Sequence, residues 1–89
     1  MTIKSIVYSS DFLNDMEGLP QEISSLALKK EKILKESPFH PSLRLHPLKG
    51  KLKGLWSMSV NMQYRIIFQL EDNEVVFISI GKHDIYRNL

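Results

Sequence analysis

Residues 63–80 read QYRIIFQLEDNEVVFISI, and this stretch decides the fold. Two runs rich in β-branched and aromatic residues flank the polar tetrapeptide EDNE (71–74), which is typical of a tight hairpin connection. Alternation along the first run sends Tyr64, Ile66 and Phe68 to one side of a strand and Arg65, Ile67 and Gln69 to the other. The stretch therefore predicts two long antiparallel strands with one apolar face.

The residues before this hairpin complete an α+β pattern. IKSIVY (3–8) is typical of a strand, and DFLNDME (11–17) of a short helix capped by Ser9 or Ser10 and ended by Gly18. Residues 21–36 place apolar side chains at helical spacing between Pro20 and Pro38. LRLHPL (43–48) favours a short edge strand, because Pro47 donates no hydrogen bond, and LWSMSV (55–60) alternates as a strand does.

The order β-α-α and then three or four strands predicts two N-terminal helices packed on one face of a mainly antiparallel sheet, followed by a short C-terminal tail. Little of the chain is left to cover the opposite face, which holds Arg65. We therefore expect that face to be open, with the tail able to fold back over it.

Length and composition narrow the class of protein. The 89 residues correspond to one domain, 1–89. The absence of cysteine excludes disulfides, thiolate zinc sites and cysteine nucleophiles. The N-terminal residues show no apolar signal-peptide core, and no apolar run approaches the ~20 residues that span a bilayer. We expect a cytoplasmic protein without a membrane partner.

The charge is unevenly distributed although its net value is only +2. No acidic residue occurs between Glu36 and Glu71, and that window carries Arg44, Lys49, Lys51, Lys53, Arg65, His40 and His46. Such a basic stretch indicates a polyanionic partner, although a solvated lysine-rich face gives the same pattern.

Two groups of residues are candidates for chemistry. Arg65 lies within a strand, where a guanidinium is costly unless it meets an acid on a neighbouring strand or faces a ligand such as phosphate. The tail GKHDIYR (81–87) adds Lys82, His83, Tyr86 and Arg87. A histidine suits general acid–base catalysis, and a tyrosine can stack on a base or transfer a proton. A lone surface histidine and a packed tyrosine ring remain the ordinary alternatives.

The segment RLHPLKGKLKG (44–54) is the second candidate region. His46 is near Arg44, and Lys49, Lys51 and Lys53 alternate with other residues, so an extended loop would project all three lysines from one side. The spacing is not that of a phosphate-binding P-loop. The three histidines lack acidic partners at ligand spacing, so we expect neither a metal site nor a cofactor.

Three motifs together resemble the RelE/ParE superfamily of bacterial toxins from type II toxin–antitoxin modules. They are Leu48-Lys49-Gly50 through Lys53-Gly54-Leu55-Trp56, then Tyr64-Arg65-Ile66-Ile67-Phe68, then Ile80-Gly81-Lys82-His83 with Tyr86 three residues later. With the β-α-α order before them, the resemblance covers essentially the whole chain.

The resemblance implies a metal-independent endoribonuclease, an mRNA interferase that cuts messenger RNA on the ribosome by attack of a ribose 2′-OH and so inhibits translation. It implies that Arg65 grips the phosphate, that Tyr86 stacks on the nucleotide or carries a proton, and that His83 or His46 is the acid or base. The basic residues Arg44, Lys49, Lys51, Lys53, Lys82 and Arg87 would bind the RNA backbone.

The resemblance also leaves alternatives open. His83 matches the YafQ-like branch, but Ser59 and Gln63 stand where that branch has a further histidine and an aspartate, whereas Arg65 is RelE-like. A ParE-like inhibitor of DNA gyrase and a catalytically inactive antitoxin-binding relative are the two other functions. The implied partners are a cognate antitoxin, mRNA and the ribosome, with DNA bound only indirectly through the antitoxin.

Overall fold

The computed structural model describes residues 2–82. Five strands and two α-helices follow in the order β1 (Ser5–Tyr8), α1 (Ser10–Glu17), α2 (Gln21–Glu36), β2 (His46–Pro47), β3 (Leu55–Ser59), β4 (Tyr64–Glu71) and β5 (Glu74–Lys82). The strands form one sheet in the order β1-β5-β4-β3-β2, in which β1 runs parallel to β5 and every other pair is antiparallel. The predicted α+β class and mainly antiparallel sheet are confirmed.

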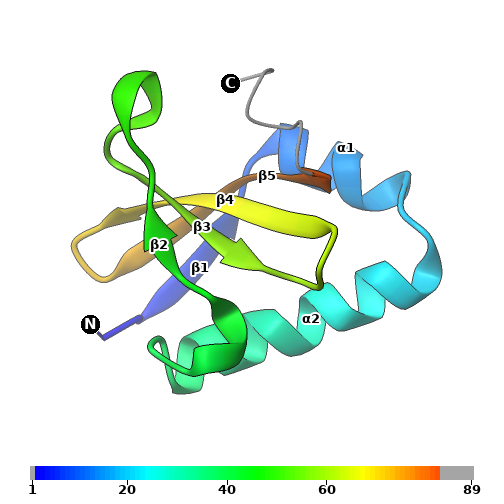
Figure 1. The fold of residues 1–89 in the computed structure, drawn as a ribbon, viewed down its shortest axis with the longest axis horizontal. Coiled ribbons are helices and arrows are strands. Elements are labelled where there is room, and N and C mark those ends of the chain that lie inside the picture. Colours follow the sequence, from blue (N-terminus) through cyan, green and yellow to red (C-terminus); the bar gives the residue numbers. More distant parts are fainter. Residues whose placement is uncertain (1, 83–89) are drawn as a thin grey trace.

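Local sequence signals set the ends of both helices. The Ser9 side chain accepts a hydrogen bond from the Phe12 N–H at 3.0 Å and so caps α1, and Gly18 ends it. Helix α2 occupies the 21–36 range that its apolar spacing predicted. Figure 1 shows α1 beside β5 and α2 along one side of the sheet. None of the helices within residues 2–82 has the length and apolar character needed to cross a membrane.

The core lies between these helices and one face of the sheet. Phe12 from α1 packs 5.2 Å from Phe77 of β5, and Phe77 packs 6.2 Å from Phe68 of β4, measured between ring centroids. Ala27 and Leu34 from α2 belong to the same buried cluster. Burying these side chains on both helices and on the central strands holds the helices on a single face.

The β4–β5 hairpin contains a feature that the sequence did not reveal. Its loop is the expected one, with strands ending at Glu71 and beginning at Glu74. Phe68 pairs with Phe77, but the next pair is Ile67 with Ser79, so Ile78 is an extra residue in β5. Such a bulge reverses the alternation of every later residue in the strand.

The N-cap residue of α1 and one side chain within the helix hold this bulge. The Ser9 hydroxyl donates to the Ile78 carbonyl at 2.7 Å, and the Ile80 N–H donates to Asp15 Oδ2 at 3.1 Å. The helix therefore satisfies two backbone groups of the irregular segment.

Several expectations require correction. The first strand spans residues 5–8 rather than 3–8, and the 43–48 segment is a strand only at His46–Pro47. The sheet face opposite the helices is not open at its centre, because Ile67 there is 0 % exposed. Ile67 lies in β4, the middle strand of the five, and its pairing partners on the same face, Ser57 and Ser79, are also buried.

We expect Asp15→Ala to lower the free energy of unfolding by about 1–3 kcal/mol, because the buried Ile80 N–H would lose a charged acceptor. Urea unfolding followed by circular dichroism measures this change. Asn14→Ala is the control, since Asn14 is an exposed residue of the same helix and its loss should cost less than about 0.5 kcal/mol. Equal stability of the Asp15 variant and wild type would contradict the role of the carboxylate.

Candidate functional site

Arg65 points to the side of the sheet away from the helices. Ile66 and Phe68 belong to the cluster that packs against the helices, whereas the buried Ile67 lies outside that cluster. Since successive side chains of a strand alternate, Arg65 shares the face of Ile67. Its partners on the adjacent strands are Ser59 and Gly81, neither of which carries charge. The positive charge of Arg65 is therefore not paired with an acidic side chain directly opposite it on either adjacent strand.

The guanidinium has unused hydrogen-bonding capacity. Within residues 2–82, Arg65 Nη1 is buried and has no hydrogen-bond partner. A buried charged donor without a partner is energetically costly, and such groups mark places where a ligand or ion supplies the missing acceptor. A phosphate oxygen is an acceptor that matches a guanidinium fork.

His46 lies on the same face. Leu45 packs against the helix-side core, and His46 pairs with Ser57, which in turn pairs with Ile67. By ideal strand spacing, the Cα atoms of His46 and Arg65 are roughly 12 Å apart, two strands across and two residues along. A group bound between the two strands is within reach of both side chains at this separation.

One ring nitrogen of His46 contacts the backbone. Its Nδ1 lies 3.3 Å from the Arg44 carbonyl oxygen, which can only accept. A proton on Nδ1 makes this contact, and in the neutral ring it leaves the lone pair on Nε2. Because the residue is exposed, Nε2 is accessible as a proton acceptor.

The basic loop beside β2 differs from the expected extended geometry. Gly50–Leu52 forms a single 3-10 turn, labelled η2, with Lys49 and Lys53 as its flanking residues. Only Lys51 lies within this turn, whereas Lys49 has an extended backbone and Lys53 follows the turn, so the three lysines do not alternate along one extended loop. All three are exposed, and Figure 1 shows their loop standing out from the sheet on the side of the view opposite α2.

The remaining predicted residues are placed as follows. Arg44 is exposed and has the left-handed backbone conformation, with φ of 45°. Lys82 pairs with Tyr64 and its Nζ lies 5.9 Å from that ring centroid, which puts it on the side opposite Arg65. His83, Tyr86 and Arg87 lie outside the described residues. Within residues 2–82, no three histidine, aspartate or glutamate side chains form a group that could hold a metal ion.

Sequence reasoning missed Ser79, whose side chain is on the Arg65 face. Ser79 pairs with Ile67 and is 8 % exposed, and its Oγ is buried without a hydrogen-bond partner in the described part of the chain. A hydroxyl within the otherwise apolar run VVFISI was the available signal. The bulge at Ile78 was needed to show which side that hydroxyl faces.

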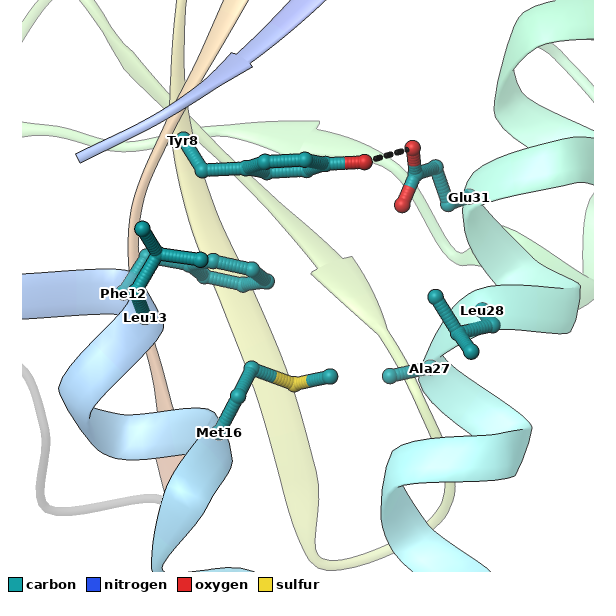
Figure 2. A pocket seen from close by; sticks show the side chains of 7 residues that line it. All are labelled: Tyr8, Phe12, Leu13, Met16, Ala27, Leu28 and Glu31. Atoms are coloured by element: carbon teal, nitrogen blue, oxygen red, sulfur yellow. Dashed lines mark hydrogen bonds between the residues drawn. The ribbon is translucent and has the colours of Figure 1, made fainter. Parts of the chain in front are cut away.

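A second, apolar hollow lies between the two helices. Figure 2 shows Phe12 and Met16 of α1 facing Ala27 and Leu28 of α2, with the Tyr8 ring closing one end. Leu13 and Leu28 at its rim are 49 % and 58 % exposed. Tyr8 and Glu31 are the ionisable residues of the lining and are bonded to each other, so the hollow is suited to apolar contact rather than catalysis.

The Tyr8 hydroxyl donates a hydrogen bond to Glu31 Oε2 at the end of this hollow (Figure 2). Burial, together with the hydrogen bond to Glu31 and its negative charge, raises the pKa of the Tyr8 phenol from 10.0 to about 12. The contact ties β1 to α2 in the protonated state of the phenol.

A family model described as the RelE-like toxin of the type II toxin–antitoxin system HigB matches residues 13–83. The toxin HigB-1 of Vibrio cholerae is 34 % identical over 71 residues, covering 73 % of this chain and 75 % of that protein. The toxin YoeB of a Synechocystis strain is 31 % identical over 52 residues, covering 58 % of this chain but only 60 % of the relative.

The fold is also that of solved toxins. The structure of YafQ from E. coli superposes with a TM-score of 0.78 at 21 % identity, covering 91 % of this chain and 94 % of that one. The toxin–antitoxin complex of DinJ and YafQ from E. coli matches with a TM-score of 0.76 at 20 % identity, covering 96 % and 97 %.

We expect one tyrosine to titrate near pH 12 in ultraviolet absorbance, and Tyr8→Phe to remove that transition. Glu31→Gln should lower the pKa of Tyr8 toward 10.0, because the carboxylate no longer opposes the phenolate. The folded chain holds this proton more tightly than the unfolded chain. The contact therefore contributes its full stability below about pH 10 and loses it as the pH rises through 12. Titration of all folded-state tyrosines near pH 10 would contradict this.

Proposed function

Because the chain belongs to the HigB-like, RelE-like family of type II toxin–antitoxin toxins, we propose that it is a ribonuclease that cleaves mRNA at the face carrying Arg65 and His46. The observation that carries the proposal is the buried, unpartnered Arg65 Nη1 within the described chain, on the same face as an accessible imidazole.

The proposed reaction uses the ribose 2′-OH. His46 Nε2 removes the proton from that hydroxyl, the 2′-oxygen forms a bond to phosphorus, and the bond from phosphorus to the 5′-oxygen breaks. The products are a 2′,3′-cyclic phosphate and a 5′-hydroxyl, whose proton comes from an acid. His83 and Tyr86 are the candidates for that acid. DNA lacks the 2′-OH, so only RNA supplies the nucleophile.

Arg65 supplies electrostatic stabilisation. Negative charge builds on the non-bridging phosphate oxygens as the 2′-oxygen attacks, and a guanidinium fork stabilises it best where water is excluded. The half-buried position of Arg65 provides such surroundings. The exposed lysines of the η2 loop and Arg44 would hold flanking RNA backbone, on mRNA or on the ribosome.

The helix side of the molecule carries a surface that suits a protein partner. Exposed Leu13 and Leu28 border an apolar hollow of about 150 Å³ between α1 and α2. We propose that an apolar segment of the cognate antitoxin docks there. The sheet separates this hollow from Arg65, so the docked segment anchors the antitoxin while a different part of it blocks the reactive face.

Arg65→Ala should reduce mRNA cleavage on translating ribosomes by at least about a hundredfold, since loss of one transition-state donor has this effect. His46→Ala should produce a similar loss if His46 is the base. Primer extension on a defined message detects the cuts, and circular dichroism verifies folding. Lys35→Ala is the matched control, because it removes an exposed cation from the end of α2.

The alternatives give different results in the same experiments. Gyrase-dependent DNA breaks without RNA cleavage would favour a ParE-like inhibitor, and wild-type protein that is inert in both assays would favour an inactive antitoxin-binding relative. Undiminished cleavage by the Arg65 and His46 variants would overturn the site assignment.

Leu28→Glu should weaken binding of the adjacently encoded antitoxin at least tenfold in calorimetry, because it buries a charge in an apolar contact. Cleavage without antitoxin should be unchanged. Met62→Glu is the control, since Met62 is 82 % exposed and lies outside the hollow. If both variants lose the same antitoxin affinity, the antitoxin does not dock in the hollow between α1 and α2.

A further inference from the structure

The hydroxyl of Ser79 lacks the partner that a buried polar group normally has. The residue is 8 % exposed, and among residues 2–82 its Oγ contacts no hydrogen-bond acceptor or donor. Leaving such a group unpaired costs free energy that alanine at the same place would avoid. An unpaired hydroxyl in the middle of an apolar strand therefore indicates a ligand that satisfies it.

The second unpaired group is next to it. Arg65 pairs with Gly81, so Ser79 is its diagonal neighbour, two residues back along β5 on the same face. Diagonal neighbours on antiparallel strands have Cα atoms roughly 7–8 Å apart, within reach of a long side chain. Gly81 has no side chain to fill the space beside the guanidinium. The two buried side-chain atoms without partners in residues 2–82, Ser79 Oγ and Arg65 Nη1, thus belong to diagonal neighbours on one face of the sheet.

We propose that Ser79 is a second phosphate ligand, whose hydroxyl donates to the phosphate oxygen beside the one that Arg65 holds. A hydroxyl donor next to a guanidinium fork matches the oxygens of a tetrahedral phosphate, and burial strengthens both hydrogen bonds. The inference rests on the proposed function for its substrate, the phosphodiester of RNA. No proton is transferred by Ser79, which binds and orients the phosphate.

The bulge in β5 supports this assignment. Without the extra Ile78, continued pairing from Phe68 and Phe77 would bring Ile67 opposite Ile78, and Ser79 would face the helices. The bulge turns Ser79 toward Arg65 and returns Ile80 to the core, where it is 3 % exposed. Bulges commonly re-aim side chains beside active sites.

The test compares anion affinity with stability. Inorganic phosphate and a 2′-deoxy dinucleotide, which cannot be cleaved, are titrated against wild type and Ser79→Ala by calorimetry. We expect about tenfold weaker binding of both probes, because one hydrogen bond to a charged group is lost. The melting temperature without ligand should stay the same or rise, since no native hydrogen bond is removed.

The control variants separate this role from a structural one. Ser59→Ala removes a hydroxyl that donates to the Asn61 carbonyl at 2.8 Å, so it should lower the melting temperature. Ser24→Ala, on α2, should leave phosphate affinity unchanged. A lowered melting temperature with unchanged phosphate affinity in Ser79→Ala would overturn the proposal and assign Ser79 a structural role.

The result is independent of the ribonuclease assay. If Arg65→Ala weakens phosphate binding but Ser79→Ala does not, the Ser79 proposal fails while the ribonuclease proposal stands. If both variants weaken phosphate binding but the wild type cuts no RNA, the anion site stands while the ribonuclease proposal fails. Tighter binding of the dinucleotide than of phosphate identifies nucleic acid rather than a free anion as the ligand.

Discussion

The pairing of β4 with β5 is the constraint on which both faces of the sheet depend. A strand has only two sides, so the register decides which residues enter the core and which meet a ligand. In this hairpin Phe68 pairs with Phe77 and belongs to the core, and one extra residue then brings Ser79 opposite Ile67. Ser9, the N-cap of α1, binds the extra residue Ile78, and Asp15 of α1 binds Ile80, so the helix that completes the core also supports the opposite face.

Much of this architecture follows from local sequence. The ends of α2 follow from Pro20 and the spacing of its apolar residues, and the EDNE loop specifies the hairpin. The side taken by Arg65 follows from simple alternation, because no irregularity lies within β4 itself. Each of these features is determined by residues close together in the chain.

The features that could not be predicted depend on contacts across the chain. The bulge at Ile78 depends on Ser9 and Asp15, which are more than sixty residues away in sequence. The raised pKa of Tyr8 needs Glu31 from a different element. The burial of Ile67 on the face opposite the helices is likewise not given by the order of elements. The side taken by Ser79 is a further example, since strict alternation from Phe77 would assign it to the helix side.

One face of the sheet stabilises the fold, and the other carries the groups proposed to bind a ligand. Aromatic and aliphatic contacts on the helix side supply the stability of a short chain. The opposite side carries two buried polar atoms without partners in residues 2–82, which together cost roughly 2–6 kcal/mol of stability if left unsatisfied.

A small domain has only a small free energy of unfolding, so unsatisfied buried groups are tolerated where a bound ligand forms the missing hydrogen bonds. If the proposed function is correct, phosphate binding offsets this free-energy cost on the Arg65 face. An antitoxin on the helix side adds stability because it binds only the folded state. Substrate and antitoxin would then stabilise the same fold from opposite sides of one sheet.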